Sequence, residues 1–109
     1  MPATLTPWRP EKPPSEEALE SILRSDGLRP SWWTNGPGDH YGVHGHPYHK
    51  VLYCARGSIR FDLPDSGETF ELEPGDRLDV PPGTRHSALV GRAGVTCVEA
   101  ARSPTKAES

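Results

Sequence analysis

The chain has 109 residues, enough for one domain, and its 12 basic and 15 acidic residues give a formal net charge of −3. These charges are mixed along the chain, without the clustered basic excess typical of a nucleic-acid or membrane-surface partner. The mean hydropathy is −0.67, no apolar run approaches the ~20 residues that cross a bilayer, and no secretory signal pattern is present. We therefore expect one soluble, cytoplasmic domain.

The first 14 residues carry five prolines, which prevent a helix from propagating there. This leader, residues 1–14, is expected to be extended or disordered. A helix is predicted over 15–26, because Ser15 can cap its first turn and Leu19 and Leu23 recur at helical spacing. Asp26-Gly27 provides its stop signal. Such a short helix is marginal alone, so we expect it to pack on the rest of the domain.

From Pro30 onward, short apolar runs alternate with Gly- and Pro-rich turns, a pattern typical of an all-β domain. Many short strands leave exposed edges unless the sheet closes, which favours a small barrel. A single domain is therefore expected over 15–100, followed by a flexible tail over 101–109. The expected strands are 31–34, 40–46, 50–56, 58–63, 69–72, 77–80, 85–90 and 95–99.

Histidines are the most informative residues of the chain. His44 and His46 are two apart, so on a strand both imidazoles project to the same face. His86, on another strand, can supply a third nitrogen from across a barrel. Three converging imidazoles with open positions suit several transition metals, and the pattern does not choose among Zn, Ni, Fe and Cu. We expect His40, by contrast, to have a structural role.

The segments around these histidines resemble the two motifs of the cupin superfamily. His44-Gly-His46 is followed by Lys50 and Gly57, which matches the spacing of Gly-x5-His-x-His-x3-Glu-x6-Gly from its first histidine onward. Gly75, Pro81, Gly83 and His86 match Gly-x5-Pro-x-Gly-x2-His-x3-Asn. The resemblance implies a double-stranded β-helix (jelly-roll) barrel, a homodimer, and a divalent metal (Fe, Ni, Zn, Cu or Mn) held by His44, His46 and His86.

Two positions depart from these motifs: Lys50 stands where the family has its glutamate ligand, and Val90 replaces the asparagine. A protonated lysine cannot bind a metal and would repel it from ~4–6 Å. Three interpretations follow. The three histidines hold a metal while Lys50 serves the substrate; His49 replaces the missing carboxylate through a bulge; or the pocket is metal-free and binds anions.

Lys50 is the catalytic candidate in the first interpretation, either anchoring a carboxylate or acting as an acid–base group. Three more residues are predicted to contact the ligand. Tyr48 can line the entrance, Cys54 shares the inward face with Lys50, and Val90 shares that of His86. No disulfide is expected between Cys54 and Cys97. Of Trp32 and Trp33, one should face the core while the other covers a dimer interface or supports the helix.

The sequence thus predicts a small barrel that binds a divalent metal and a small, anionic organic ligand, with an oxygenase or isomerase type of activity. The alternative is a non-catalytic binding or sensing module that uses the same barrel, with or without a metal. The residues do not separate these two functions, because the fold alone does not supply a reaction.

Overall fold

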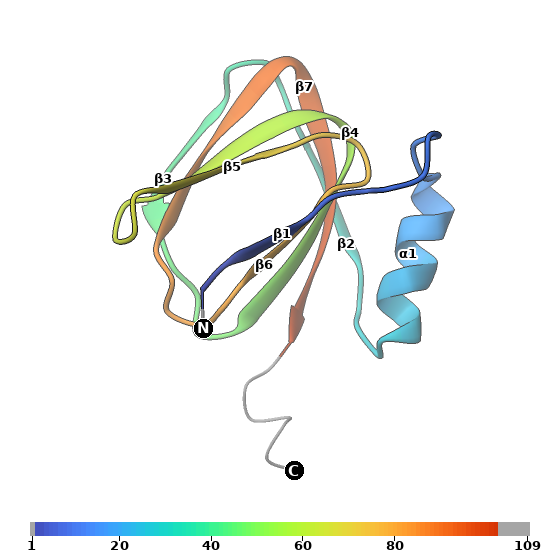
Figure 1. Ribbon diagram of the computed structural model, residues 1–109, viewed down its shortest axis with the longest axis horizontal. Coiled ribbons are helices and arrows are strands. Elements are labelled where there is room, and N and C mark those ends of the chain that lie inside the picture. Colours follow the sequence, from blue (N-terminus) through green and yellow to red (C-terminus); the bar gives the residue numbers. More distant parts are fainter. Residues whose placement is uncertain (1, 103–109) are drawn as a thin grey trace.

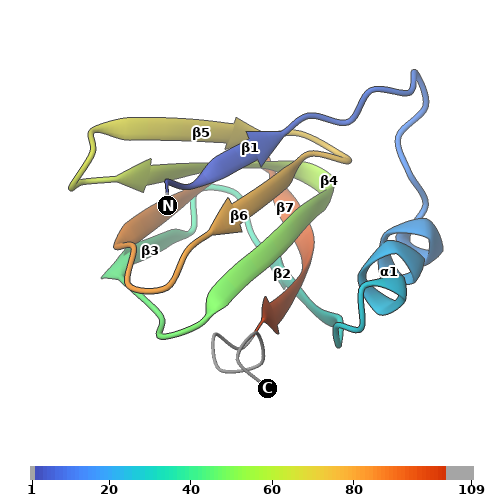
Figure 2. The same cartoon turned by 60° about the horizontal axis from the view of Figure 1, so that its bottom comes forward.

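Two long antiparallel strands, β4 (His49–Leu63) and β7 (His86–Arg102), form the centre of the sheet in the computed structural model, which describes residues 2–102. All strand pairs in this range are antiparallel, and the strands follow the order β1-β6-β4-β7-β2, with β5 beside β4 and β3 beside β7. The sheet curls into a barrel (Figures 1 and 2), which confirms the all-β double-stranded β-helix. The other strands are β1 (Thr4–Thr6), β2 (Ser31–Asn35), β3 (His40–His44), β5 (Glu68–Leu72) and β6 (Arg77–Val80).

Each long strand was predicted as two separate strands, and that part of the prediction is wrong. β4 continues through Gly57, and β7 continues through the expected turn at 91–94. Bulges interrupt the β4–β7 register on either side of Gly57 and let the strands bend without ending. Gly57 and Gly94 have φ of 77° and 78°, a backbone conformation that glycine adopts without strain.

Side chains alternate between the two faces of this sheet. The inner face forms the barrel core around residues such as Leu52, Cys54 and Phe61. The outer face of β4 and β7 is covered by the helix α1 (Glu16–Ser25), whose Leu19 and Leu23 are fully buried there. Ser15 caps the helix by accepting a hydrogen bond from the Ala18 backbone amide at 3.0 Å. No helix within residues 2–102 is long and apolar enough to cross a membrane.

The leader joins the barrel through its first residues. Thr4–Thr6 is the extended strand β1, which pairs with β6 and brings Ala3 and Leu5 to the core. Trp8 donates its backbone N–H to Asp76 at 2.9 Å, and its ring packs on Gly75, leaving no room there for a Cβ atom. Of the expected tail, Ala101 and Arg102 belong to β7, and 103–109 lie outside the described residues.

Candidate metal centre and ligand pocket

The three histidines of the two motifs meet at one end of the barrel. His44 ends β3 and pairs in register with His86 at the start of β7, while His46 follows in the loop between β3 and β4. One ring nitrogen from each lies within 4.8 Å of the other two. The strand predicted over 40–46 ends at His44, yet the two histidines still converge, with ring centroids 5.0 Å apart.

Backbone carbonyls set the orientation of two of these rings. Nδ1 of His44 lies 2.8 Å from the Gly42 carbonyl oxygen, and Nδ1 of His86 lies 3.0 Å from that of Thr84. A carbonyl oxygen only accepts, so each Nδ1 donates its proton and Nε2 keeps a free lone pair. Metal-binding histidines are typically held in this way.

Two of the Nε2 atoms are buried without a partner among the described residues. They belong to His46 and His86, whose Nε2 atoms have no hydrogen bond and almost no exposed surface. Burying an unpaired polar nitrogen is costly, so such atoms call for a ligand. A divalent transition metal accepts three neutral imidazole nitrogens and keeps open positions for a ligand. The donor set therefore fits a metal, with His44, His46 and His86 as its holders.

Burial lowers the pKa of His46 and of His86, and the Lys50 ammonium and the neighbouring histidines lower them further. For His86, the Thr84 carbonyl opposes this shift without cancelling it. Both imidazoles are therefore neutral at pH 7, the form that binds metals.

These shifts predict that the metal-free protein loses stability as the pH falls below about 6.5, the ordinary histidine value. The unfolded chain takes up protons there while the folded His46 and His86 resist protonation, so acid favours unfolding. Urea unfolding in a chelator, between pH 7 and pH 5, should give a falling free energy of unfolding. The double variant H46A/H86A should flatten this dependence, whereas an equal slope in both proteins would contradict the assignment.

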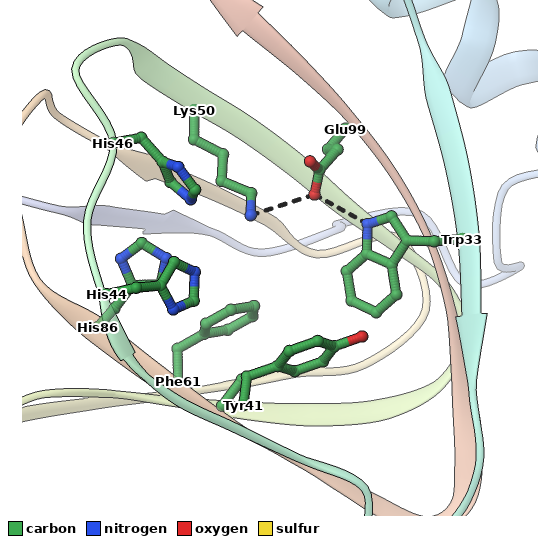
Figure 3. Close-up of a pocket in the computed structure, with 9 residues that line it drawn as sticks. Trp33, Tyr41, His44, His46, Lys50, Phe61, His86 and Glu99 are labelled. Atoms are coloured by element: carbon green, nitrogen blue, oxygen red, sulfur yellow. Dashed lines mark hydrogen bonds and ion pairs between the residues drawn. The ribbon is translucent and has the colours of Figure 1, made fainter.

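A cavity of about 230 Å³ opens beside the histidines (Figure 3). Its walls are largely aromatic, and it also carries two charged side chains, Lys50 from β4, which lies beside His46, and Glu99 from β7. Apolar walls with a few converging polar groups are typical of small-molecule sites. The cavity is lined by Trp33, Tyr41, His44, His46, Lys50, Phe61, His86, Ala88 and Glu99.

Lys50 does not stand alone in this cavity. Its Nζ lies 3.2 Å from Oε1 of Glu99, and the same oxygen accepts a hydrogen bond from Nε1 of Trp33 at 2.8 Å. Glu99 was not among the predicted site residues. The inward tryptophan was predicted to be a core residue, and Trp33 does pack against the barrel core while it contacts Glu99. One indication was present in the sequence: residues two apart on a strand point to the same face, and Glu99 lies two residues after the inward-facing Cys97. The partners of Glu99, however, depend on the β2–β7 register.

The structure places the other predicted contact residues around the cavity rather than on its lining. Tyr48 stacks on His46 at a centroid distance of 4.8 Å, while Cys54 and Val90 belong to the barrel core. Ala88, which shares the inward face with Val90, lines the cavity instead. His49 points to the outer face, where its Nε2 lies 2.8 Å from Asp79, so it does not join the other histidines.

The two cysteines are direct neighbours in the core. Cys54 and Cys97 are register partners on β4 and β7, and both are fully buried, free cysteines. A hydrogen bond with Cys54, together with burial, raises the pKa of the Cys97 thiol. Such a thiol stays protonated and chemically inert.

The two tryptophans separate as their alternation predicts. Trp33 faces inward and contacts Glu99, whereas Trp32 packs in the layer under the helix and donates its Nε1 hydrogen to Glu20 on α1. Of the two roles considered for the outward tryptophan, the structure shows support of the helix.

Comparisons with known proteins give one family and many structural relatives. A family model described as "Cupin domain" matches residues 31–92, whereas no curated protein matches the chain. An RmlC-like cupin from Shewanella frigidimarina is 23% identical, with a TM-score of 0.59 over 72% of this chain and 69% of its own. The polyketide cyclase RemF from Streptomyces resistomycificus is 25% identical, with a TM-score of 0.61 over 71% and 56%. The DMSP lyase DddQ from Ruegeria pomeroyi is 21% identical, with a TM-score of 0.64 over 71% and 39%.

Proposed function

Because the chain belongs to the cupin family, we propose that it binds a divalent transition metal through His44, His46 and His86, together with a small anionic organic ligand in the adjoining cavity. The observation that carries this proposal is the pair of buried Nε2 atoms without partners. The cavity of about 230 Å³ limits the ligand to a small molecule.

A bound metal supplies a Lewis acid that polarises an oxygen of the ligand or activates O2. The chain's own residues hold and orient the ligand: the aromatic walls exclude water, and Lys50 donates hydrogen bonds from β4. An oxygenase or isomerase type of activity would use the metal, the aromatic walls and Lys50 together. The polyketide cyclase and the DMSP lyase are enzymes with the same fold, which supports a catalytic function without identifying the reaction.

A non-catalytic binding or sensing module is the second candidate. Lys50 favours the binding module, because this chain has a cation where the family has a glutamate ligand. The metal therefore lacks one ligand and faces a positive charge, which weakens metal binding. Thermal-shift measurements with small organic acids separate the two candidates when followed by product analysis. Stabilisation without turnover indicates a binding module. The homodimer and the cytoplasmic location remain predictions.

Elemental analysis tests the metal site. The wild-type protein, purified without chelator, is expected to hold about one equivalent of a transition metal, and H46A less than about a tenth, since two nitrogens hold a metal far more weakly. H40A is the matched control, because His40 begins β3, the strand that ends at His44, and its side chain is exposed. Metal below a tenth of an equivalent in both wild type and H46A would overturn the proposal.

A further inference from the structure

His46 differs from the other two histidines of the metal centre in what holds its ring. It lies in a loop, and it faces the close pair of His44 and His86 from the side of Lys50 (Figure 3). The rings of His44 and His86 are each oriented by a backbone carbonyl at Nδ1. Within residues 2–102 the His46 ring has no such hydrogen bond, so another contact must orient its Nε2.

The backbone at His46 is held in place, but this does not fix the side chain. The His46 carbonyl oxygen accepts a hydrogen bond from the Gly83 backbone amide at 2.7 Å. Pro47 follows, and a residue before proline is restricted to extended backbone conformations. These restraints set the direction of the Cα–Cβ bond, whereas the imidazole can still turn about its two side-chain torsions.

Tyr48 supplies the missing restraint on this ring. It stacks on the His46 imidazole, with the ring centroids 4.8 Å apart and the ring planes 21° from parallel. A stacked neighbour covers one face of the imidazole and opposes its rotation. The lone pair of Nε2 lies in the plane of the ring, so the stack leaves it free. The contact therefore orients Nε2 without competing for it.

The same contact should strengthen when a metal binds. The face of the Tyr48 ring is the negative part of its quadrupole, and an imidazole that gives a lone pair to a divalent cation becomes electron-poor. The stack is therefore more favourable with the metal than without it. Part of its energy contributes to metal affinity rather than to folding.

We propose that Tyr48 is a positioning residue of the metal centre, which holds the His46 imidazole by stacking so that Nε2 points toward the other two histidines. Tyr48 does not line the cavity beside the histidines, so it acts through His46 rather than by contact with the ligand. It lines an outer cavity of about 580 Å³ and belongs to neither buried core cluster, so its replacement should leave the barrel folded. This inference rests on the proposed function, because it requires a metal at the three histidines.

Competition with a chromophoric chelator for Zn²⁺ tests this role in wild type, Y48L and Y48F. Y48L keeps an apolar side chain but removes the aromatic face, so Zn²⁺ should bind about tenfold more weakly, a loss typical of residues that orient a metal ligand. Y48F keeps the stacking face and should retain the wild-type affinity. The control Y53L removes a tyrosine ring from the outer face of β4, under the helix. It should leave the Zn²⁺ affinity unchanged even where it lowers the melting temperature.

The visible absorption of the Co²⁺-loaded proteins gives a second readout, because its d–d bands follow the geometry of the metal ligands. Y48F should reproduce the wild-type spectrum, and Y48L should not. Circular dichroism verifies folding, and Y48M replaces Y48L if that variant does not fold.

Two kinds of failure can be told apart in this experiment. Equal Zn²⁺ affinities in wild type and Y48L, an equal loss in Y48L and Y48F, or one Co²⁺ spectrum shared by all three proteins would overturn the inference and leave the metal site intact. If wild type itself binds no Zn²⁺, the proposed metal site is contradicted, and the positioning role of Tyr48 with it.

Discussion

Replacing Lys50 with glutamate is expected to raise the affinity for a divalent cation about a hundredfold. The change removes an ammonium group that opposes the cation and places a carboxylate where the cupin motif has its glutamate ligand. Two unit charges ~5 Å apart interact with about 3 kcal/mol when the effective dielectric constant is near 20, and a divalent cation doubles this energy. A hundredfold, which corresponds to about 2.7 kcal/mol, is therefore a conservative expectation. Competition with a chromophoric chelator for Zn²⁺ measures the affinity directly.

Two variants separate charge from ligation in this experiment. K50M removes the ammonium without adding a ligand, so its affinity should lie between those of wild type and K50E. K12E makes the same change of charge in the leader, away from the histidines, and should leave the affinity unchanged. Equal Zn²⁺ affinities in wild type, K50M and K50E would show that Lys50 does not oppose the metal.

The metal-free K50E protein should at the same time be less stable than wild type. Its new carboxylate lies beside Glu99, which has lost its cationic partner, and two like charges in a partly buried cavity repel. Zn²⁺ should restore the melting temperature. Affinity and stability would thus move in opposite directions in this variant.

Replacing Gly57 with alanine is expected to destabilise the protein by about 3–5 kcal/mol, a large part of the 5–15 kcal/mol that stabilises a typical domain. Gly57 has a φ of +77°, and a Cβ there would overlap the Gly94 carbonyl oxygen and lie 2.8 Å from the Gly94 carbonyl carbon. These atoms belong to the backbone of β7, so they cannot turn aside as a side chain does. Chemical unfolding followed by circular dichroism measures the loss.

G83A is the matched control for this prediction. Gly83 has a similar φ of +78°, but no atom lies within 4 Å of the position that a Cβ would occupy. Its replacement should cost only the backbone strain, about 1–2 kcal/mol. The difference in unfolding free energy between the two variants therefore measures the cost of a Cβ atom where β4 and β7 approach each other closely. Equal losses of unfolding free energy in G57A and G83A would show that this close contact adds nothing to the cost of backbone strain.

The sequence predicted the metal centre better than the ligand cavity. His44, His46 and His86 stand in motifs whose spacing is fixed by one strand, one loop and one turn, so local rules bring them together. Glu99 was missed because its contacts with Lys50 and Trp33 join three strands. Those contacts depend on the registers of β4–β7 and β2–β7, which no local pattern in the chain specifies.

The strand boundaries show a similar limit. The sequence predicts that strands end at the glycines at 57, 91 and 94, because glycine is typical of turns. In the structure they lie within β4 and β7 and permit the bends that close the barrel. Helix α1, in contrast, follows from its cap, its apolar spacing and its stop signal, all of which lie within 13 residues of chain.

The three tryptophans lie in three separate regions: Trp8 of the leader packs on Gly75, Trp32 lies under the helix, and Trp33 lies against Glu99 in the cavity. Indole emission responds to the polarity and charge around each ring, so the protein carries three built-in optical reporters. A protein that keeps Trp33 alone, with phenylalanine at the other two positions, would give a fluorescence signal from the cavity itself. Occupancy of the cavity could then be followed at micromolar protein concentrations without a chemical label.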